Sequence, residues 1–151
     1  MRRKPSARGP VAAGPRRAFV DSSGWIALIS ADDTNHVAAD GVFRRAIARR
    51  VSLVTTNLVL AEVHRLLLHR VGIRAASAAL ARMEASPAVS LQFTTRDHHE
   101  AARRWLTKLS DQTITYTDAV SFAVAHATSC DVVIGFDSDF VVAGFVPWRA
   151  P

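Results

Sequence analysis

The sequence of 151 residues contains one cysteine and few lysines, and each scarcity narrows the class of protein. The lone Cys130 excludes a disulfide framework and a cysteine-based zinc site, and it favours a reducing cytoplasm as the compartment. The only lysines, Lys4 and Lys108, do not lie near the last predicted strand. A phosphate-accepting domain of the response-receiver type needs a lysine there and paired acids after its first strand, so the sequence argues against that class.

Long hydrophobic runs are absent as well. No apolar stretch approaches the roughly 20 residues that a membrane-spanning helix needs. The N-terminal region has no apolar segment of the kind found in a secretory signal. The histidines have no zinc-site spacing, and we expect all of them at or near the surface. They are His36, His64, His69, His98, His99 and His126.

The body of the chain has no excess of positive charge, although the net charge of the whole sequence is +6. The first 17 residues hold six of the 19 Lys and Arg residues and no acid, so the remainder is balanced at 13 basic and 13 acidic residues. Rich in Pro, Gly, Ala and Arg, residues 1–17 are predicted to be a disordered basic tail, with the folded domain at 18–151. The tail is either a solvated extension, a non-specific phosphate-binding arm, or the product of a misassigned start, with Val11 as the alternative beginning.

Short apolar runs alternate with helical patterns along the rest of the sequence. Strands are predicted at 18–20, 52–56, 89–93, 131–134 and 145–148. Helices are predicted at 24–30, 36–50, 58–71, 73–85, 96–109 and 118–128, with a short one ending at 142. This alternation predicts an α/β fold, a three-layer α/β/α sandwich with a mainly parallel sheet.

Four acidic residues stand where a strand ends or a helix begins, each among apolar neighbours. They are Asp21, Glu62, Asp118 and Asp137. Ligands bind beyond the carboxyl ends of the strands in such sheets, where Asp21 and Asp137 are expected. Helix capping alone would explain Asp21 or Asp118, an ion pair with Arg65 would explain Glu62, and Asp139 competes with Asp137.

Carboxylates that share a site repel one another unless a cation or a proton compensates them. Mg²⁺ prefers oxygen ligands and needs only a few of them, because it keeps several waters. A divalent ion lowers the pKa of a bound water and stabilises a leaving oxygen, which is the chemistry of phosphodiester hydrolysis. The sequence has no plausible Ser–His–Asp or Cys–His arrangement, so these acids are the candidate catalytic group.

The segments around these acids resemble the four acidic motifs of PIN domains, and most closely those of VapC-type toxins of bacterial toxin–antitoxin pairs. The resemblance covers roughly residues 18 to 148. The segments are Phe19-Val20-Asp21-Ser22-Ser23, Leu60-Ala61-Glu62-Val63, Thr117-Asp118-Ala119-Val120-Ser121 and Gly135-Phe136-Asp137-Ser138-Asp139-Phe140.

The resemblance implies a PIN-like fold and a Mg²⁺- or Mn²⁺-dependent endoribonuclease that cleaves RNA. Asp21, Glu62, Asp118 and Asp137 would be catalytic, and these four together with Asp139 would be the metal ligands. A cognate antitoxin would inhibit the enzyme, and the toxin would form a homodimer. The alternative is a non-catalytic PIN-like module that binds RNA.

One departure from the family is visible, because Gly135 stands where many members have Thr or Ser. Ser22, Ser23 or Ser121 either supplies a hydroxyl in its place or serves only helix capping and packing. Two groups of basic residues face either RNA or solvent: Arg44, Arg45, Arg49 and Arg50, and Arg103, Arg104 and Lys108. Apolar residues of the early helices serve either the core or the antitoxin contact: Trp25, Ile29, Val42 and Phe43.

Overall fold

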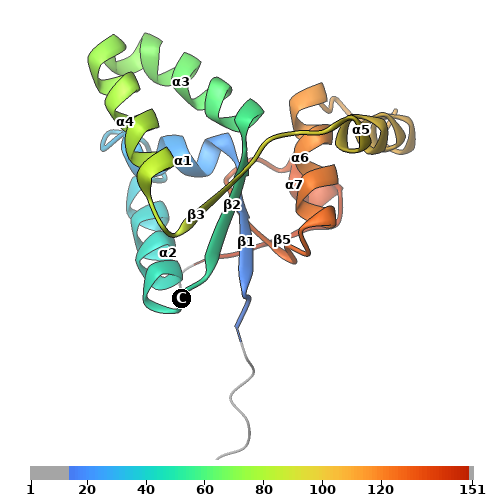
Figure 1. Cartoon of the computed structure of the whole chain (residues 1–151), viewed down its shortest axis with the longest axis horizontal. Coiled ribbons are helices and arrows are strands. Elements are labelled where there is room, and N and C mark those ends of the chain that lie inside the picture. The colour runs from blue at the N-terminus through green and yellow to red at the C-terminus, as the bar shows by residue number, and fades with distance from the viewer. Residues whose placement is uncertain (1–13, 150–151) are drawn as a thin grey trace, which may run out of the picture.

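Residues 14–149 are described in the computed structural model, and they form a five-stranded sheet with helices on both faces (Figure 1). The strand order is β3-β2-β1-β4-β5, and all neighbouring strands are parallel. The strands are β1 (Arg17–Val20), β2 (Ser52–Thr56), β3 (Val89–Gln92), β4 (Val132–Ile134) and β5 (Val146–Pro147). The predicted parallel α/β fold is confirmed.

Helices connect successive strands and form the two outer layers. Figure 1 shows α1 to α4 on one side of the sheet and α5 to α7 on the other. The helices are α1 (Ser22–Ile29), α2 (His36–Ala48), α3 (Asn57–Val71), α4 (Ile73–Ala85), α5 (Arg96–Lys108), α6 (Tyr116–Ala127) and α7 (Asp139–Val142). None of the helices within residues 14–149 is long and apolar enough to cross a membrane.

Only the last residues of the predicted tail, 14–17, belong to the described part of the chain. Residues 1–13 lie outside the described residues. Arg17 already belongs to β1, where it is in register with Ser52 of β2, so the first strand begins one residue before the predicted boundary.

The core fills both sides of the sheet. Phe19 of β1 stacks on Phe140 at 5.6 Å between ring centroids, and Phe140 meets Phe122 of α6 edge-on at 4.8 Å. On the opposite side, Trp25 of α1 contacts Phe43 of α2 at 5.1 Å. Each of these buried rings contributes roughly 1.5–3 kcal/mol to folding, so the sheet that carries the acids is a rigid support.

Two helices begin earlier than predicted because a threonine caps each of them. The Thr56 hydroxyl accepts the Val59 N–H, so α3 starts at Asn57, which is not the cap. The Thr115 hydroxyl likewise accepts the Asp118 N–H, and α6 starts at Tyr116. Both corrections follow from the preference of Thr for the N-cap position, where its oxygen satisfies a free amide.

The centre of the sheet is the point where the chain changes direction. Strands β1 and β4 are neighbours, but β1 leads into α1 on one face while β4 is reached from α6 on the other. Gly24 lets α1 begin directly over this junction, because a side chain there would come within 2.5 Å of the Ile134 carbonyl oxygen. Such a switch point opens a crevice at the carboxyl ends of the strands, where α/β proteins bind ligands.

Candidate active site

Asp21 follows the last residue of β1 and is 3% exposed. Its backbone N–H donates to the Ile134 carbonyl at 3.0 Å, which fixes it to the end of β4. Its carboxylate accepts a hydrogen bond from the Ser23 hydroxyl at 3.0 Å from Oδ2, and the same hydroxyl accepts the Phe136 N–H at 2.9 Å. Ser23 therefore ties the Asp21 carboxylate to the chain that leaves β4.

Burial raises the pKa of Asp21 from 3.8 to about 6. Hydrogen bonds from the Ser22 backbone and the Ser23 side chain oppose the rise, while the charges of Asp118 and Glu62 add to it. No arginine or lysine of residues 14–149 forms an ion pair with Asp21, Glu62 or Asp118. The site therefore gathers negative charge without a cation from the described protein.

Glu62 lies in the second turn of α3 and is half-buried. The alternative ion pair with Arg65 is not formed, since the salt bridges within residues 14–149 join Arg44 to Asp40 and Arg70 to Asp33. Its charge acts on Asp21 instead. Helix α3 thus brings a carboxylate from the β2 side toward the end of β1.

Asp118 occupies the first turn of α6 and is half-buried. Its Oδ2 accepts the Thr115 hydroxyl at 2.6 Å and the Thr115 N–H at 3.2 Å, in a capping box. The expected capping role is therefore real, and it coexists with a position from which its charge raises the pKa of Asp21. The contribution of Thr115 was missed from the sequence, although the Thr-x-x-Asp spacing is the signature of such a box.

The side chains of Asp137 and Asp139 differ in burial and in their contacts. Asp137 is exposed and its Oδ1 accepts the Asp139 N–H at 3.1 Å, at the start of α7. Asp139 is half-buried, and its pKa is raised by desolvation, by the charges of Asp137 and Asp118, and by a side-chain contact with Asp118. Of the two rivals, Asp139 is the one that faces Asp118.

We call Asp21, Glu62, Asp118 and Asp139 the acidic site. The charges of Asp118 and Glu62 act on Asp21, and those of Asp118 and Asp137 act on Asp139. Within residues 14–149, no three acidic, His or Cys side chains lie close enough to chelate an ion as they stand. The donor set nevertheless suits a hard divalent cation, because it consists of oxygens with a surplus of negative charge.

Gly135 lies directly against this group. A Cβ on Gly135 would stand 3.2 Å from Asp21 Cβ and 3.2 Å from Ser23 Oγ. The Ser23 hydroxyl therefore occupies the space beside Asp21 that a larger residue 135 would enter. Ser121 follows Asp118 by three residues on α6, and its hydroxyl is buried without a partner among the described residues.

A second opening lies on the α1–α4 side of the sheet. It is an apolar groove of about 720 Å³ between α1, α2, α4 and β3, and Arg44 and Arg82 are among its lining residues. Its apolar lining includes Trp25, Ile29, Phe43, Ile47 and Met83. Four apolar residues are expected from the sequence to serve either the core or a partner contact. Trp25, Phe43 and Val42 are buried in the core, and Trp25, Ile29 and Phe43 also line this groove.

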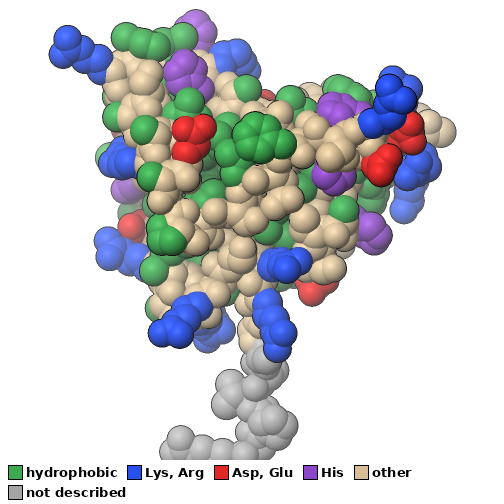
Figure 2. Space-filling model, viewed as in Figure 1, with side chains coloured by type: hydrophobic (Ala, Val, Ile, Leu, Met, Phe, Trp, Pro, Cys, Tyr) green, Lys and Arg blue, Asp and Glu red, His purple; other side chains and the backbone are tan. Residues whose placement is uncertain are grey.

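The basic residues at the end of α2 lie far from the acidic site. Helix α2 ends beside the start of β2, at the amino edge of the sheet (Figure 1). In the space-filling view, Lys and Arg side chains gather along this lower edge and at the outer helix ends (Figure 2). Arg44 pairs with Asp40 at 2.7 Å. Whether this cluster faces RNA or only solvent stays an open prediction.

Comparison with known proteins identifies the family. A family model described as the PIN domain matches residues 18–146. The chain belongs to the PIN domain family. The match spans β1 to β5 and includes every acid of the site, so it confirms the family that the four motifs indicated.

Within the PIN family, the chain is similar to toxins of the VapC type. The chain is 39% identical over 132 residues to the 23S rRNA-specific endonuclease VapC20 of two Mycobacterium tuberculosis strains, CDC 1551 / Oshkosh and ATCC 25618 / H37Rv. The alignment covers 87% of this chain and 97% of the relative. These matches confirm the predicted likeness to VapC-type toxins and, with it, the prediction of an RNA-cleaving enzyme.

A solved PIN-domain structure has the same architecture. The crystal structure of Mycobacterium tuberculosis VapC20, described as a sarcin–ricin loop cleaving toxin, superimposes with a TM-score of 0.77 at 38% identity. The match covers 87% of this chain and 98% of that one. The predicted PIN-like α/β/α fold is confirmed.

Proposed function

We propose that the protein is an endoribonuclease toxin that hydrolyses RNA with Mg²⁺ or Mn²⁺ held at the acidic site. The main support for this proposal is the environment of Asp21. Its side chain is only 3% exposed, and its pKa is raised by burial and by the charges of two neighbouring acids. A buried cluster of like charges is unfavourable for folding alone. A divalent cation would offset the repulsion and give the site its chemistry.

When bound, the cation supplies a water of lowered pKa and stabilises the negative charge that develops on the phosphate. Asp21 and Asp118 would be its central protein ligands, and Glu62 would act directly or through water. The Ser23 and Thr115 hydroxyls hold these two aspartates by donating to one oxygen of each, at 3.0 and 2.6 Å. Each aspartate keeps its other oxygen for the cation. The unpartnered Ser121 hydroxyl is placed to bind a water of the outer shell.

For the remaining ligand we propose Asp139, because it contacts Asp118 while Asp137 is exposed. Asp137 would then hold the start of α7 by accepting the Asp139 N–H. Asp139→Asn is expected to lower the rate of RNA cleavage more than Asp137→Asn does. The reverse order would return Asp137 to the catalytic set.

The RNA that we propose as substrate is the sarcin–ricin loop of 23S rRNA. The 23S rRNA-specific endonuclease VapC20 is 39% identical to this chain over 87% of its length. Its crystal structure is described as that of a toxin that cleaves the sarcin–ricin loop. Action on ribosomal RNA agrees with a cytoplasmic location, which we also propose.

For the inhibitor we propose a small antitoxin protein that lays an amphipathic segment in the apolar groove. The exposed Ile47 and the half-buried Ile29 offer apolar contacts above the buried floor of the groove. Arg44 and Arg82 offer charge for acidic side chains of the segment. Helix-in-groove recognition has this pattern of apolar anchors and a charged rim. We propose a homodimer on the family likeness alone, and light scattering of the purified toxin tests it.

Incubation of purified protein with ribosomes or 23S rRNA tests the proposed enzyme, with primer extension to locate the cut. Cleavage at a single site is expected with Mg²⁺ or Mn²⁺ and not with EDTA. The variant Asp118→Asn should be inactive, while Asp131→Asn, an exposed aspartate outside the site, should cleave normally. Cleavage that survives both EDTA and Asp118→Asn would refute the mechanism. Specific binding without cleavage would favour the non-catalytic alternative.

A further inference from the structure

The most exposed aromatic ring among the described residues stands at the same edge of the sheet as the acidic site. Phe93 is 71% exposed and directly follows β3, whose last residue, Gln92, is in register with Thr56 of β2. Burying a Phe side chain is worth roughly 1.5–3 kcal/mol, so folding gains little from a Phe in this position. The face of the ring is therefore free to contact a molecule outside the chain.

The backbone beside this ring is held firmly. The Thr94 N–H donates to Asn57 Oδ1 at 2.9 Å, which joins the segment to the start of α3. The Thr94 hydroxyl lies 3.1 Å from His99 Nε2, which joins it to α5. Phe93 thus projects from a braced segment rather than from a loose loop.

A second ring belongs to the same network. The hydroxyl of Tyr116 lies 2.6 Å from His99 Nδ1, with the two rings 5.5 Å apart, and Tyr116 is 44% exposed. The polar end of Tyr116 is thereby satisfied, while much of its ring stays open to solvent. Tyr116 stands two residues before Asp118 on α6. The network therefore runs from the residue after Phe93 to the first turn that carries a metal-ligand candidate.

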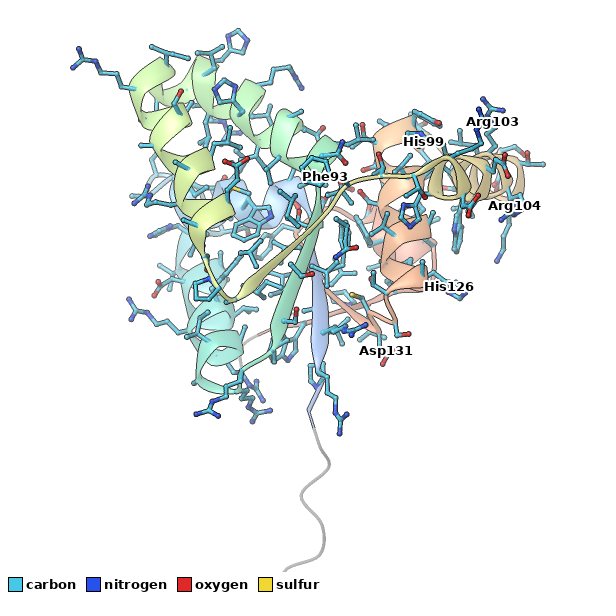
Figure 3. All side chains as sticks on the ribbon, viewed as in Figure 1. Phe93, His99, Arg103, Arg104, His126 and Asp131 are labelled. Atoms are coloured by element: carbon cyan, nitrogen blue, oxygen red, sulfur yellow. The ribbon has the colours of Figure 1, made fainter. Side chains whose placement is uncertain are left out.

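The figures place Phe93 over the carboxyl edge of the sheet. In Figure 1 the chain leaves β3, passes in front of the strand ends and enters α5, between α3 and α6. In Figure 3 Phe93 lies between the start of α3 and His99. The space-filling view shows hydrophobic surface in the same central region (Figure 2). Arg103 and Arg104 extend from the far side of α5 (Figure 3), exposed and without a carboxylate partner among the described residues.

We infer that Phe93 and Tyr116 form a stacking site for unpaired RNA bases next to the scissile phosphate, with His99 as the residue that positions both. The inference rests on the proposed ribonuclease function and assigns the part of the RNA that it selects. Bases in a duplex are stacked on their neighbours and offer no free face, whereas bases of a loop stack on aromatic side chains. The pair would therefore favour an RNA loop with splayed bases over a duplex.

Steady-state cleavage of an RNA hairpin with an unpaired loop tests the stacking site. Phe93→Ala is expected to lower kcat/KM by roughly 5- to 100-fold, mainly through KM, because one base loses its stacking partner. Phe93→Tyr keeps an aromatic face and should retain most of the activity, whereas Phe93→Leu, apolar but not aromatic, should resemble Phe93→Ala. The matched control is Val37→Ala, an exposed apolar residue on α2.

His99→Gln tests the positioning role. It should raise KM with little change in kcat, since it loosens the Tyr116 contact without touching the acids. A fall in kcat with an unchanged KM would instead assign His99 to the chemistry and remove it from the inference.

A binding readout that needs no cleavage completes the test. Trp25 and Trp148 are buried and Trp105 is half-buried, so the variant Phe93→Trp adds an exposed indole to the described part of the chain. In EDTA, the hairpin should quench its fluorescence saturably, and a blunt duplex of equal composition should quench it far less. Val37→Trp should show no such difference.

The outcomes separate this inference from the function on which it rests. Wild-type cleavage with unchanged kcat/KM in Phe93→Ala overturns the stacking site and leaves the ribonuclease intact. No RNA cleavage by the wild type overturns the proposed function, and quenching of Phe93→Trp by the hairpin would still show base binding. If Phe93→Ala changes only dimerisation or antitoxin binding, the ring belongs to a protein interface and the inference fails.

Discussion

The acidic site and the apolar groove lie on opposite sides of α1 and differ in almost every physical property. The acidic site has four carboxylates, and the charges of neighbouring acids help to raise the pKa of Asp21 and of Asp139. Among the described residues, no ion pair is formed with Asp21, Glu62 or Asp118. The groove is mostly apolar, and its charged residues are arginines. One opening is under electrostatic strain that a cation would relieve, and the other is apolar surface that a partner would cover. If the proposed function holds, reaction and inhibition use separate physical forces in this fold.

The largest effect should come from the acids. Asp118→Asn is expected to reduce the rate of RNA cleavage by at least about 100-fold, because it removes a ligand of an ion worth several kcal/mol to the transition state. Cleavage of 23S rRNA measures it, with binding to a groove partner as the control that should stay unchanged. If Asp118→Asn impaired both equally, the two openings would not be independent.

The pH dependence of stability tests the strain at the acidic site. The pKa of Asp21 is raised from 3.8 to about 6, so the folded state holds its proton more tightly than the unfolded state does. Without metal, the protonated Asp21 therefore contributes about 3 kcal/mol to the free energy of unfolding below about pH 4. This contribution is lost as the pH rises to about 6. Chemical unfolding of wild type and Asp21→Asn across this range measures the difference.

Metal should reverse this loss. Millimolar Mn²⁺ at pH 7.5 is expected to raise the Tm of the wild type and to raise that of Asp21→Asn much less, because binding to the folded state stabilises it by mass action. Equal shifts in the two proteins would mean that the ion binds elsewhere.

A substitution in the groove should weaken partner binding without changing RNA cleavage at the acidic site. Ile47 is 53% exposed and lines the groove, so Ile47→Asp introduces a charge with little harm to the core. Binding of the proposed antitoxin is expected to weaken by about 30-fold or more, as for a hot-spot residue. Pull-down and calorimetry measure this effect, and RNA cleavage should remain at the wild-type rate.

The smallest effect concerns the hydroxyl beside Asp21. Ser23→Ala removes the hydrogen bond to Asp21 Oδ2 and is expected to slow RNA cleavage by about 10-fold, as outer-shell changes do. Adding Gly135→Ser to Ser23→Ala should restore part of the rate, since the new Cβ would stand 3.2 Å from the present site of Ser23 Oγ. No recovery in the double variant would show that position 135 does not reach Asp21.

The sequence predicted the strands, the sheet class and the main acids because each rests on local signals. Apolar runs that end in Asp21 or precede Gly135 mark strand ends, and parallel strands bring those ends to one edge. The family and fold predicted from the motifs are confirmed. The roles of individual acids in catalysis stay predictions.

What the sequence did not predict depends on distant contacts. The proposed preference for Asp139 over Asp137 depends on the closeness of Asp139 to Asp118, and neighbours in the sequence do not decide that. The link from Thr94 through His99 to Tyr116 joins three elements by side-chain geometry alone. The groove likewise required the packing of α1, α2 and α4 to be known.

Helix α1 carries a constraint on how such a toxin can evolve. Ser23, which holds Asp21, and Trp25, which lines the groove, are two residues apart, and Gly24 between them tolerates no side chain. The Trp25 indole donates to the Thr55 hydroxyl, which donates to the carbonyl of Val20 beside Asp21. A mutation that frees the toxin from its inhibitor through α1 would therefore disturb the placement of Asp21. Escape variants should arise in α2 or α4 instead.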